Sequence, residues 1–172
     1  MSEVDISKLS ILIVEDNVHF RTLVRTILEA LGVKNIEEAR DGAEAMDVLK
    51  NFNADMAILD WKMDGINGVE CVRRIRFGND SRNKFLPIIL CTGYTEDSLK
   101  HEARDAGANA FLAKPISAKS LLSRITSVME ENRPFVRIDS YFGPDRRRLN
   151  KQFDDTERRK EQPKLIPVDN KS

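Results

Sequence analysis

Short apolar runs alternate with stretches of helical spacing along the first 131 residues. The runs that predict buried strands are 9–14, 34–39, 56–59, 87–91 and 110–113. The stretches that follow them and predict helices are 18–31, 43–52, 69–77, 96–106 and 117–129. Strands and helices that alternate at short connections favour an α/β fold. The pattern predicts a doubly wound, five-stranded parallel sheet with helices on both faces.

The first predicted helix has a regular apolar face. Its members are Phe20, Leu23, Val24, Ile27, Leu28 and Leu31, and Gly32 follows as a stop signal. We expect this face to pack against the sheet. The two cysteines, Cys71 and Cys91, lie within predicted elements, where we expect small core residues. Their number and spacing offer neither a disulfide framework nor a zinc site.

Polar side chains stand at the carboxyl ends of four predicted strands. Glu15 and Asp16 follow the first strand, Asp60 follows the third, Thr92 the fourth and Lys114 the fifth. Open α/β sheets bind their ligands at this edge. Clustered carboxylates repel one another and favour a cation, and oxygen ligands with room for water suit Mg²⁺. A hydroxyl and an ammonium beside them would serve the oxygens of a phosphoryl group. The pattern indicates Mg²⁺-assisted phosphoryl transfer to a carboxylate.

Residues 9–130 resemble the receiver domain of two-component response regulators, which has a CheY-like (flavodoxin-like) fold. The match is carried by the acidic pair, the segment ILDWKMDGINGVE, the pair Thr92-Gly93 and the pair Lys114-Pro115. The resemblance implies that Asp60 is a phosphoacceptor, phosphorylated by a sensor histidine kinase or a histidine phosphotransfer protein. It implies a switch rather than an enzyme, with only slow loss of its own phosphate.

The same resemblance assigns roles to the other site residues. Asp16, Asp60 and the backbone carbonyl of Lys62 would hold Mg²⁺, with Glu15 acting through water. Thr92 would be the switch hydroxyl, Lys114 the phosphate partner and Phe111 the switch aromatic. A receiver that has lost phosphorylation stays open as an alternative, as does Phe111 as a plain core residue.

Three positions depart from the family pattern. Glu15 stands where Asp is common, Asp64 replaces the usual Pro after Met63, and Phe111 lacks the hydroxyl of a Tyr. The change at Asp64 predicts a looser loop beside the metal. None of the three removes a catalytic group.

The composition changes after Asn132. Residues 1–131 hold 17 Lys and Arg against 21 Asp and Glu, a net charge of −4, and residues 132–172 hold 11 against 7, a net charge of +4. No helical or alternating pattern continues, so we expect a receiver domain over 1–131 and a largely irregular, disordered tail over 132–172. The tail is too short for a helix-turn-helix DNA-binding domain. The chain shows neither a signal region nor a run of membrane-spanning length, so we expect it in the cytoplasm.

The tail interleaves arginines with aromatic residues. Arginine can grip a guanine with two bonds, an aspartate can accept from a guanine, and aromatic rings stack on bases for about 1–3 kcal/mol each. The segment RPFVRIDSYFGPDRRR resembles the arginine-rich tail of the CheY-like cyclic di-GMP effectors. The resemblance implies that cyclic di-GMP orders the tail. The implied ligand residues are Arg137, Asp139, Tyr141, Asp145, Arg146, Arg147, Arg148, Arg158 and Arg159.

Taken together, the two resemblances imply a single-domain response regulator that docks on a partner such as the flagellar motor switch, in chemotaxis and motility. The docking surface would be helix 96–106, the strand to Phe111 and the last helix. The competing class is a phosphorelay intermediate with an inert tail. For the tail itself, a solvated basic linker or weak attraction to RNA, DNA or a membrane surface also stays open, although seven acidic residues dilute its charge.

Overall fold

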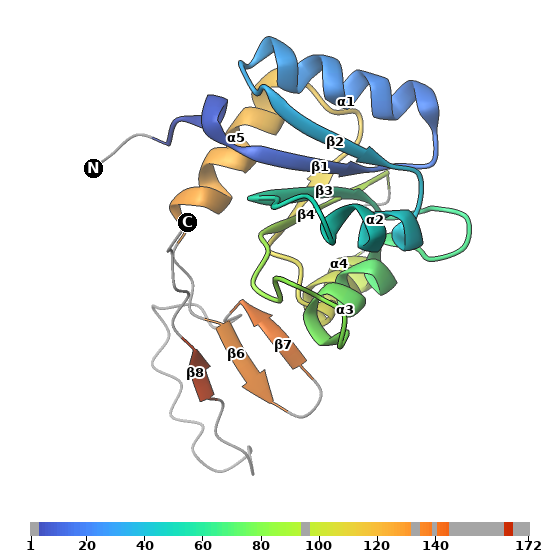
Figure 1. The fold of residues 1–172 in the computed structure, drawn as a ribbon, viewed down its shortest axis with the longest axis vertical. Helices are drawn as coiled ribbons and strands as arrows, with labels where there is room; N and C mark the ends of the chain where they lie inside the picture. Colours follow the sequence, from blue (N-terminus) through green and yellow to red (C-terminus); the bar gives the residue numbers. More distant parts are fainter. Residues whose placement is uncertain (1–3, 94–96, 132–134, 139–140, 145–163, 167–172) are drawn as a thin grey trace.

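The predicted parallel sheet forms the centre of the molecule. A computed structural model describes residues 4–93, 97–131, 135–138, 141–144 and 164–166. After a short 3-10 helix at Ile6–Lys8, five strands pair in parallel in the order β2-β1-β3-β4-β5 (Figure 1). They are β1 (Ser10–Val14), β2 (Asn35–Ala39), β3 (Met56–Asp60), β4 (Ile88–Thr92) and β5 (Ala110–Ala113). The predicted fold class is confirmed.

Five helices follow the five strands. They are α1 (Val18–Ala30), α2 (Gly42–Leu49), α3 (Gly68–Phe77), α4 (Asp97–Ala106) and α5 (Ala118–Glu130). Four of them begin at a capping side chain that accepts a hydrogen bond from a backbone N–H in the first turn. The capping residues are Asn17, Asp41, Asn67 and Ser117. The predicted bounds of the five helices agree with those of the structure to within a few residues.

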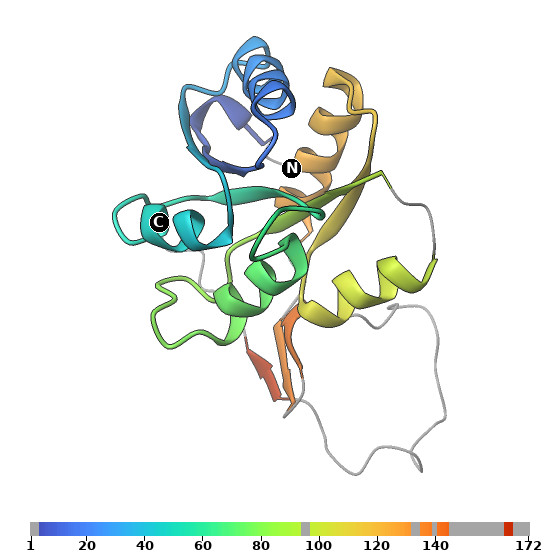
Figure 2. The same cartoon turned by 90° about the vertical axis from the view of Figure 1, so that its right-hand side faces the viewer.

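The sheet is buried on both faces, as its continuous apolar strands require. Val24 and Leu28 of α1 and Leu121 of α5 belong to the core on one face. The core on the other face is built with α2, α3 and α4, and Figures 1 and 2 show these helices on that side. Both cysteines are buried and free, as predicted. The prediction for Leu23 is wrong: it lies 45% exposed, because α1 contacts the sheet through a narrower stripe centred on Val24 and Leu28.

A second, smaller sheet follows α5. It consists of β6 (Phe135–Ile138), β7 (Tyr141–Pro144) and β8 (Lys164–Ile166), antiparallel and in the order β7-β6-β8. The sequence pattern did not predict these strands, because they show neither a continuous apolar run nor an alternation of apolar and polar positions. They lie within the predicted tail, and Figure 1 shows them below α3 and α4.

Within the described residues, none of the helices combines the length and the apolarity needed to cross a membrane.

Candidate phosphoacceptor site

Three carboxylates meet at the carboxyl edge of the sheet. Strands β1 and β3 are neighbours, with Val14 paired to Leu59, so the residues after Val14 face the end of β3. One carboxylate oxygen from each of Glu15, Asp16 and Asp60 lies within 4.8 Å of the others. Glu15 is 2% exposed and Asp60 6% exposed, whereas Asp16 is exposed. The predicted acidic cluster is thus present, with one member open to solvent.

Two backbone features hold Asp60 and Asp16 in place. A Cβ atom at Gly68 would lie 2.3 Å from the carbonyl oxygen of Asp60, so only glycine allows α3 to start so close to the strand end. The backbone N–H of Asp64 donates to Asp16 Oδ2 at 3.2 Å. A proline at position 64 would lack this donor. The departure at Asp64 therefore allows a hydrogen bond between the loop and the acidic pair that a proline could not make, and the looser loop stays a prediction.

Glu15 carries the clearest sign that the site holds a cation. Its Oε1 accepts from the Asn17 backbone N–H at 3.1 Å, but its buried Oε2 has no hydrogen-bond partner. The nearest cation, Lys114 Nζ, is 3.7 Å from Oε2, beyond hydrogen-bonding reach. Burial raises the pKa of Glu15 to about 7. The hydrogen bond from Asn17 lowers this pKa, and the negative charge of Asp60 raises it further. An unpartnered buried oxygen beside two aspartates fits Mg²⁺, which prefers oxygen ligands and retains water.

Lys114, which directly follows β5, reaches into the same cluster. Its Nζ lies 2.7 Å from Asp60 Oδ1 and 3.9 Å from the centre of the Phe20 ring, a cation–π contact. Burial lowers its pKa, but the hydrogen bond and charge of Asp60 outweigh burial and leave the pKa above its ordinary value. Lys114 is therefore a fixed positive charge at the Asp60 carboxylate. The Lys114–Pro115 peptide bond is cis.

Of the remaining predicted site residues, Thr92 and Lys62 lie at the same edge of the sheet, and Phe111 lies two residues before the end of β5. Thr92 is buried and ends β4, where its carbonyl accepts from the Lys114 backbone N–H at 2.8 Å. Phe111 in β5 is partly buried and packs against the core on the α2–α4 face. Lys62 is exposed in the loop that follows β3. The structure thus brings Thr92 and Lys114 together and gives Phe111 a position between core and surface.

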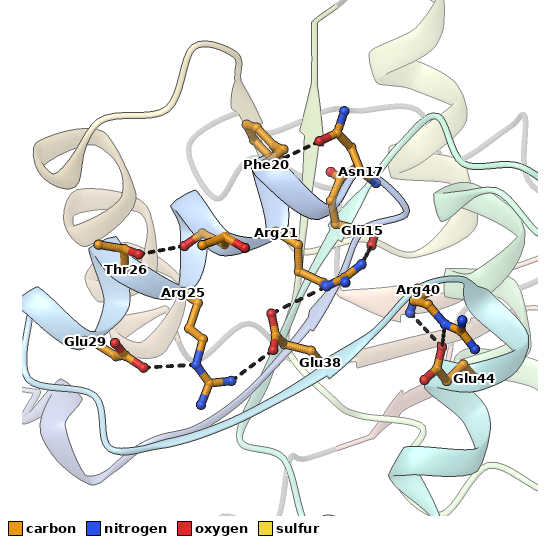
Figure 3. A network of polar contacts seen from close by, with 11 residues as sticks. Glu15, Asn17, Phe20, Arg21, Arg25, Thr26, Glu29, Glu38, Arg40 and Glu44 are labelled. Atoms are coloured by element: carbon orange, nitrogen blue, oxygen red, sulfur yellow. Dashed lines mark hydrogen bonds and ion pairs between the residues drawn. The ribbon is translucent and has the colours of Figure 1, made fainter.

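Arg21 supports the acidic loop, and the sequence analysis missed it. Its Nη1 donates to the Glu15 backbone carbonyl at 2.8 Å, and its Nε lies 3.4 Å from Glu38 Oε1 (Figure 3). Glu38 also pairs with Arg25, whose Nε bonds to Glu29 at 2.9 Å. The sequence feature that could have indicated this role is the position of Arg21 in the first turn of α1. A cation there is unfavourable with the helix dipole, so a specific carboxylate or carbonyl partner is expected.

Most of the predicted nucleotide-binding residues lie outside the described part of the chain. These are Asp139, Asp145, Arg146, Arg147, Arg148, Arg158 and Arg159. The backbones of Arg137 and Tyr141 are described, in β6 and β7, whereas their side chains are not.

A cavity of about 400 Å³ lies away from this chemistry. It is lined by residues that include Phe52, Ala54, Arg82 and Leu86. Ala54 precedes β3, whereas Asp60 ends it, so the cavity is at the amino edge of the sheet. None of the predicted phosphoacceptor-site residues lines this cavity.

Comparison with known proteins identifies the family of this chain. Residues 11–126 match the family model described as response regulator receiver domain. Among curated proteins, the chain is 34% identical over 122 residues to a chemotaxis protein CheY of Pseudomonas aeruginosa, an alignment covering 71% of this chain and 97% of that protein.

Solved structures give the same result. A Vibrio cholerae chemotaxis protein CheY4 superposes with a TM-score of 0.64 at 31% identity, covering 70% of this chain and 98% of that one. The receiver domain of a Pseudomonas aeruginosa sensor histidine kinase, solved with a magnesium ion coordinated in its active-site cleft, gives 0.63 at 26% identity, covering 72% and 98%. The match to the family model ends at residue 126, before the second sheet.

Proposed function

Since this chain belongs to the response regulator receiver domain family, we propose that it acts as a response regulator, phosphorylated on Asp60 by a histidine kinase. The observation that carries the proposal is the environment of Asp60. This buried carboxylate lies 2.7 Å from the Lys114 ammonium and within 4.8 Å of two further carboxylates. Its place at the end of β3 leaves one side of the group facing the edge where parallel sheets bind ligands.

The proposed chemistry is transfer of a phosphoryl group from a kinase phosphohistidine. A carboxylate oxygen of Asp60 forms a bond to phosphorus while the bond from phosphorus to the histidine nitrogen breaks, and the imidazole leaves with that electron pair. Mg²⁺, held by Glu15, Asp16, Asp60 and the Lys62 carbonyl, would neutralise the negative charge that gathers here. Lys114 would then pair with a phosphoryl oxygen, and the Thr92 hydroxyl would donate to another. Phe111 would be the aromatic residue that changes its position when Asp60 is phosphorylated.

Phosphorylation by a small donor tests this assignment. We expect the protein to gain one phosphoryl group from acetyl phosphate with Mg²⁺, as seen by intact mass, and Asp60→Asn to gain none while keeping its circular dichroism spectrum. Asp64→Asn is the matched control, since it removes a carboxylate from the same loop but keeps the backbone bond to Asp16. Equal labelling of the Asp60→Asn variant would contradict the proposal.

We also propose that the tail binds cyclic di-GMP. The support is the resemblance of residues 133–148 to the tails of CheY-like cyclic di-GMP effectors, together with the positive charge of the tail. The ligand joins guanines and phosphates, which arginine, aspartate and aromatic side chains recognise by different contacts. Arg137 and Tyr141 lie on adjacent strands of the hairpin, so both belong to one structural unit.

Calorimetric titration tests the tail. We expect saturable binding of cyclic di-GMP to the full chain and its loss in the triple variant Arg146→Ala, Arg147→Ala, Arg148→Ala. The matched control removes three exposed arginines of the receiver, Arg73, Arg74 and Arg104, and so changes net charge equally. No heat with any of these proteins would leave a phosphoreceiver with a basic tail.

The proposed output is docking on a partner protein in the cytoplasm, in response to either input. Similarity to chemotaxis proteins makes the flagellar motor switch the leading partner. The likeness to the receiver domain of a sensor histidine kinase supports a second candidate, a phosphorelay intermediate. That alternative predicts rapid reverse transfer from Asp60 to a histidine phosphotransfer protein and no effect of cyclic di-GMP on any partner contact.

A further inference from the structure

The hairpin of β6 and β7 has no part in the Asp60 site, yet it is packed against the receiver. Its strands pair from Phe135 opposite Pro144 to Ile138 opposite Tyr141. Strand β7 contacts both α3 and α4. Figures 1 and 2 show the hairpin beside these two helices from perpendicular directions.

One aromatic side chain anchors the hairpin. Phe142 of β7 is 1% exposed, although it comes from a segment rich in charge. Its ring meets the Phe77 ring at 6.4 Å and 68° and the Phe85 ring at 5.5 Å and 64°. Such edge-to-face pairs are a preferred arrangement of aromatic rings. Phe77 ends α3 and Phe85 lies before β4, so Phe142 joins the hairpin to two separate segments of the receiver.

The backbone of the receiver is shaped for this contact. Gly107 follows α4 with a φ of +105°, and a Cβ atom there would lie 2.6 Å from the Phe142 carbonyl oxygen. The fully buried Arg76 fixes the neighbouring backbone by donating to the carbonyls of Gly107 at 3.1 Å and Lys84 at 2.8 Å. The hairpin therefore docks on a surface whose main chain is held rigidly in place.

Helix α4 connects this docking surface to the Asp60 site. Strand β4 ends at Thr92, α4 runs from Asp97 to Ala106, and Gly107 meets the hairpin. Ten helical residues span roughly 15 Å. Ala103 and Ala106 are buried in the core, so the C-terminal half of α4 is packed between core and hairpin. Strand β7 contacts α4, so a shift of α4 would change the contacts of the hairpin.

We propose that the β6–β7 hairpin is an intramolecular clamp on the C-terminal end of α4, and that its docking is coupled to the phosphorylation state of Asp60. Coupling of this kind is reciprocal: what changes hairpin docking also changes phosphorylation equilibria. The inference rests on the proposed phosphorylation of Asp60 and is independent of any nucleotide.

Hydrogen exchange on the full chain tests the clamp. In the unphosphorylated protein we expect Phe142→Ala to speed amide exchange about tenfold in residues 135–144 and in the last turn of α4, because local opening becomes easier. Phe142→Leu should restore part of the protection. Phe153→Ala, which removes another aromatic ring of the tail, is the matched control. Unchanged exchange of α1 and α5 shows that each variant remains folded. Unaltered exchange in α4 with Phe142→Ala would overturn the clamp.

The coupling is tested by adding Mg²⁺ and acetyl phosphate, with phosphorylation followed by intact mass. We expect phosphorylation to change exchange in residues 135–144 of the wild type severalfold, and to leave the already fast exchange of this segment unchanged in Phe142→Ala. A phosphorylated wild type with unaltered hairpin exchange would overturn the coupling while leaving the proposed function intact. A wild type that gains no phosphoryl group would contradict the proposed function and the coupling together.

Discussion

The ionisation of Glu15 makes the site sensitive to pH. Burial raises the pKa of its carboxyl from 4.5 to about 7, so between these values the folded protein binds more protons than the unfolded chain. Without a cation, the free energy of unfolding therefore falls as the pH rises from 4.5 to about 7 and is level above that range. Mg²⁺ competes with the same proton, so we expect its affinity to be about tenfold weaker at about pH 6 than at about pH 8.

Trp61 provides the measurement, because it directly follows Asp60 and is the single tryptophan of the chain. Titrating Mg²⁺ against its fluorescence at several pH values gives the affinity profile. In Glu15→Gln, which cannot ionise, we expect weaker binding and a profile that is flat through pH 7. An equally steep profile in this variant would show that another group controls the metal site.

Lys114 and Mg²⁺ would share the carboxylate of Asp60. The ammonium lies 2.7 Å from Asp60 Oδ1 and repels a second cation nearby. We expect Lys114→Met to bind Mg²⁺ about tenfold more tightly by Trp61 fluorescence, since loss of the positive charge removes this repulsion. Lys119→Met, an exposed lysine at the start of α5, is the control for net charge and should leave the affinity unchanged. Weaker Mg²⁺ binding in Lys114→Met would contradict the argument.

Much of the site could be predicted from single residues, because its geometry follows from the sheet. Once the strands are parallel, Glu15, Asp16, Asp60, Thr92 and Lys114 must share one edge. The contacts between side chain and backbone could not be predicted in this way. The bond from Arg21 to the Glu15 carbonyl depends on how α1 lies over β2, and sequence periodicity does not specify that packing.

At the scale of elements, the pattern predicted the five parallel strands and the five α-helices of the receiver, because continuous apolar runs alternate there with stretches of helical spacing. It failed for the hairpin, where a four-residue strand with a glycine and a proline carries no period. It also failed for Arg76, which lies in the charged run RRIR and is nonetheless fully buried. Charge alone favours exposure, and only the surrounding carbonyl groups explain this arginine.

Arg76 ties together the C-terminal ends of α3 and α4. Its guanidinium donates to the Gly107 and Lys84 carbonyls and, at 2.9 Å, to Asn109 Oδ1. Arg76→Met keeps most of the volume but removes the donor to the Gly107 and Lys84 carbonyls, whereas Asn109 Oδ1 still accepts from the Ile88 backbone N–H. We expect it to lower the free energy of unfolding by about 2–4 kcal/mol in urea denaturation. Arg73→Met, exposed on the same helix, should stay within about 0.5 kcal/mol. Equal losses of unfolding free energy in Arg76→Met and Arg73→Met would contradict the stabilising role of the buried Arg76 hydrogen bonds.

The whole molecule divides its charge unevenly, and this division affects any ligand of the tail. The receiver part carries −4 and the tail +4, so a long polyanion would be drawn to the tail and repelled by the body. Affinity for a polyanion depends steeply on salt, because each neutralised phosphate releases counterions. A ligand with only two phosphates releases few counterions on binding, so most of its affinity must come from contacts with its bases.

Salt dependence therefore separates the proposed cyclic di-GMP site from general anion binding. Between roughly 50 and 200 mM salt, we expect the affinity for cyclic di-GMP to fall by less than about tenfold, whereas a nucleic acid held at six or more phosphates would lose about a thousandfold. Calorimetry of the full chain with cyclic di-GMP, and separately with a single-stranded RNA, gives both slopes. A steep slope with RNA and no saturable binding of the dinucleotide would assign the arginines to polyanion attraction. The same test uses a ligand with the same phosphates but with adenines in place of guanines. If it binds with the same affinity and the same weak dependence on salt, the tail does not recognise the guanine bases.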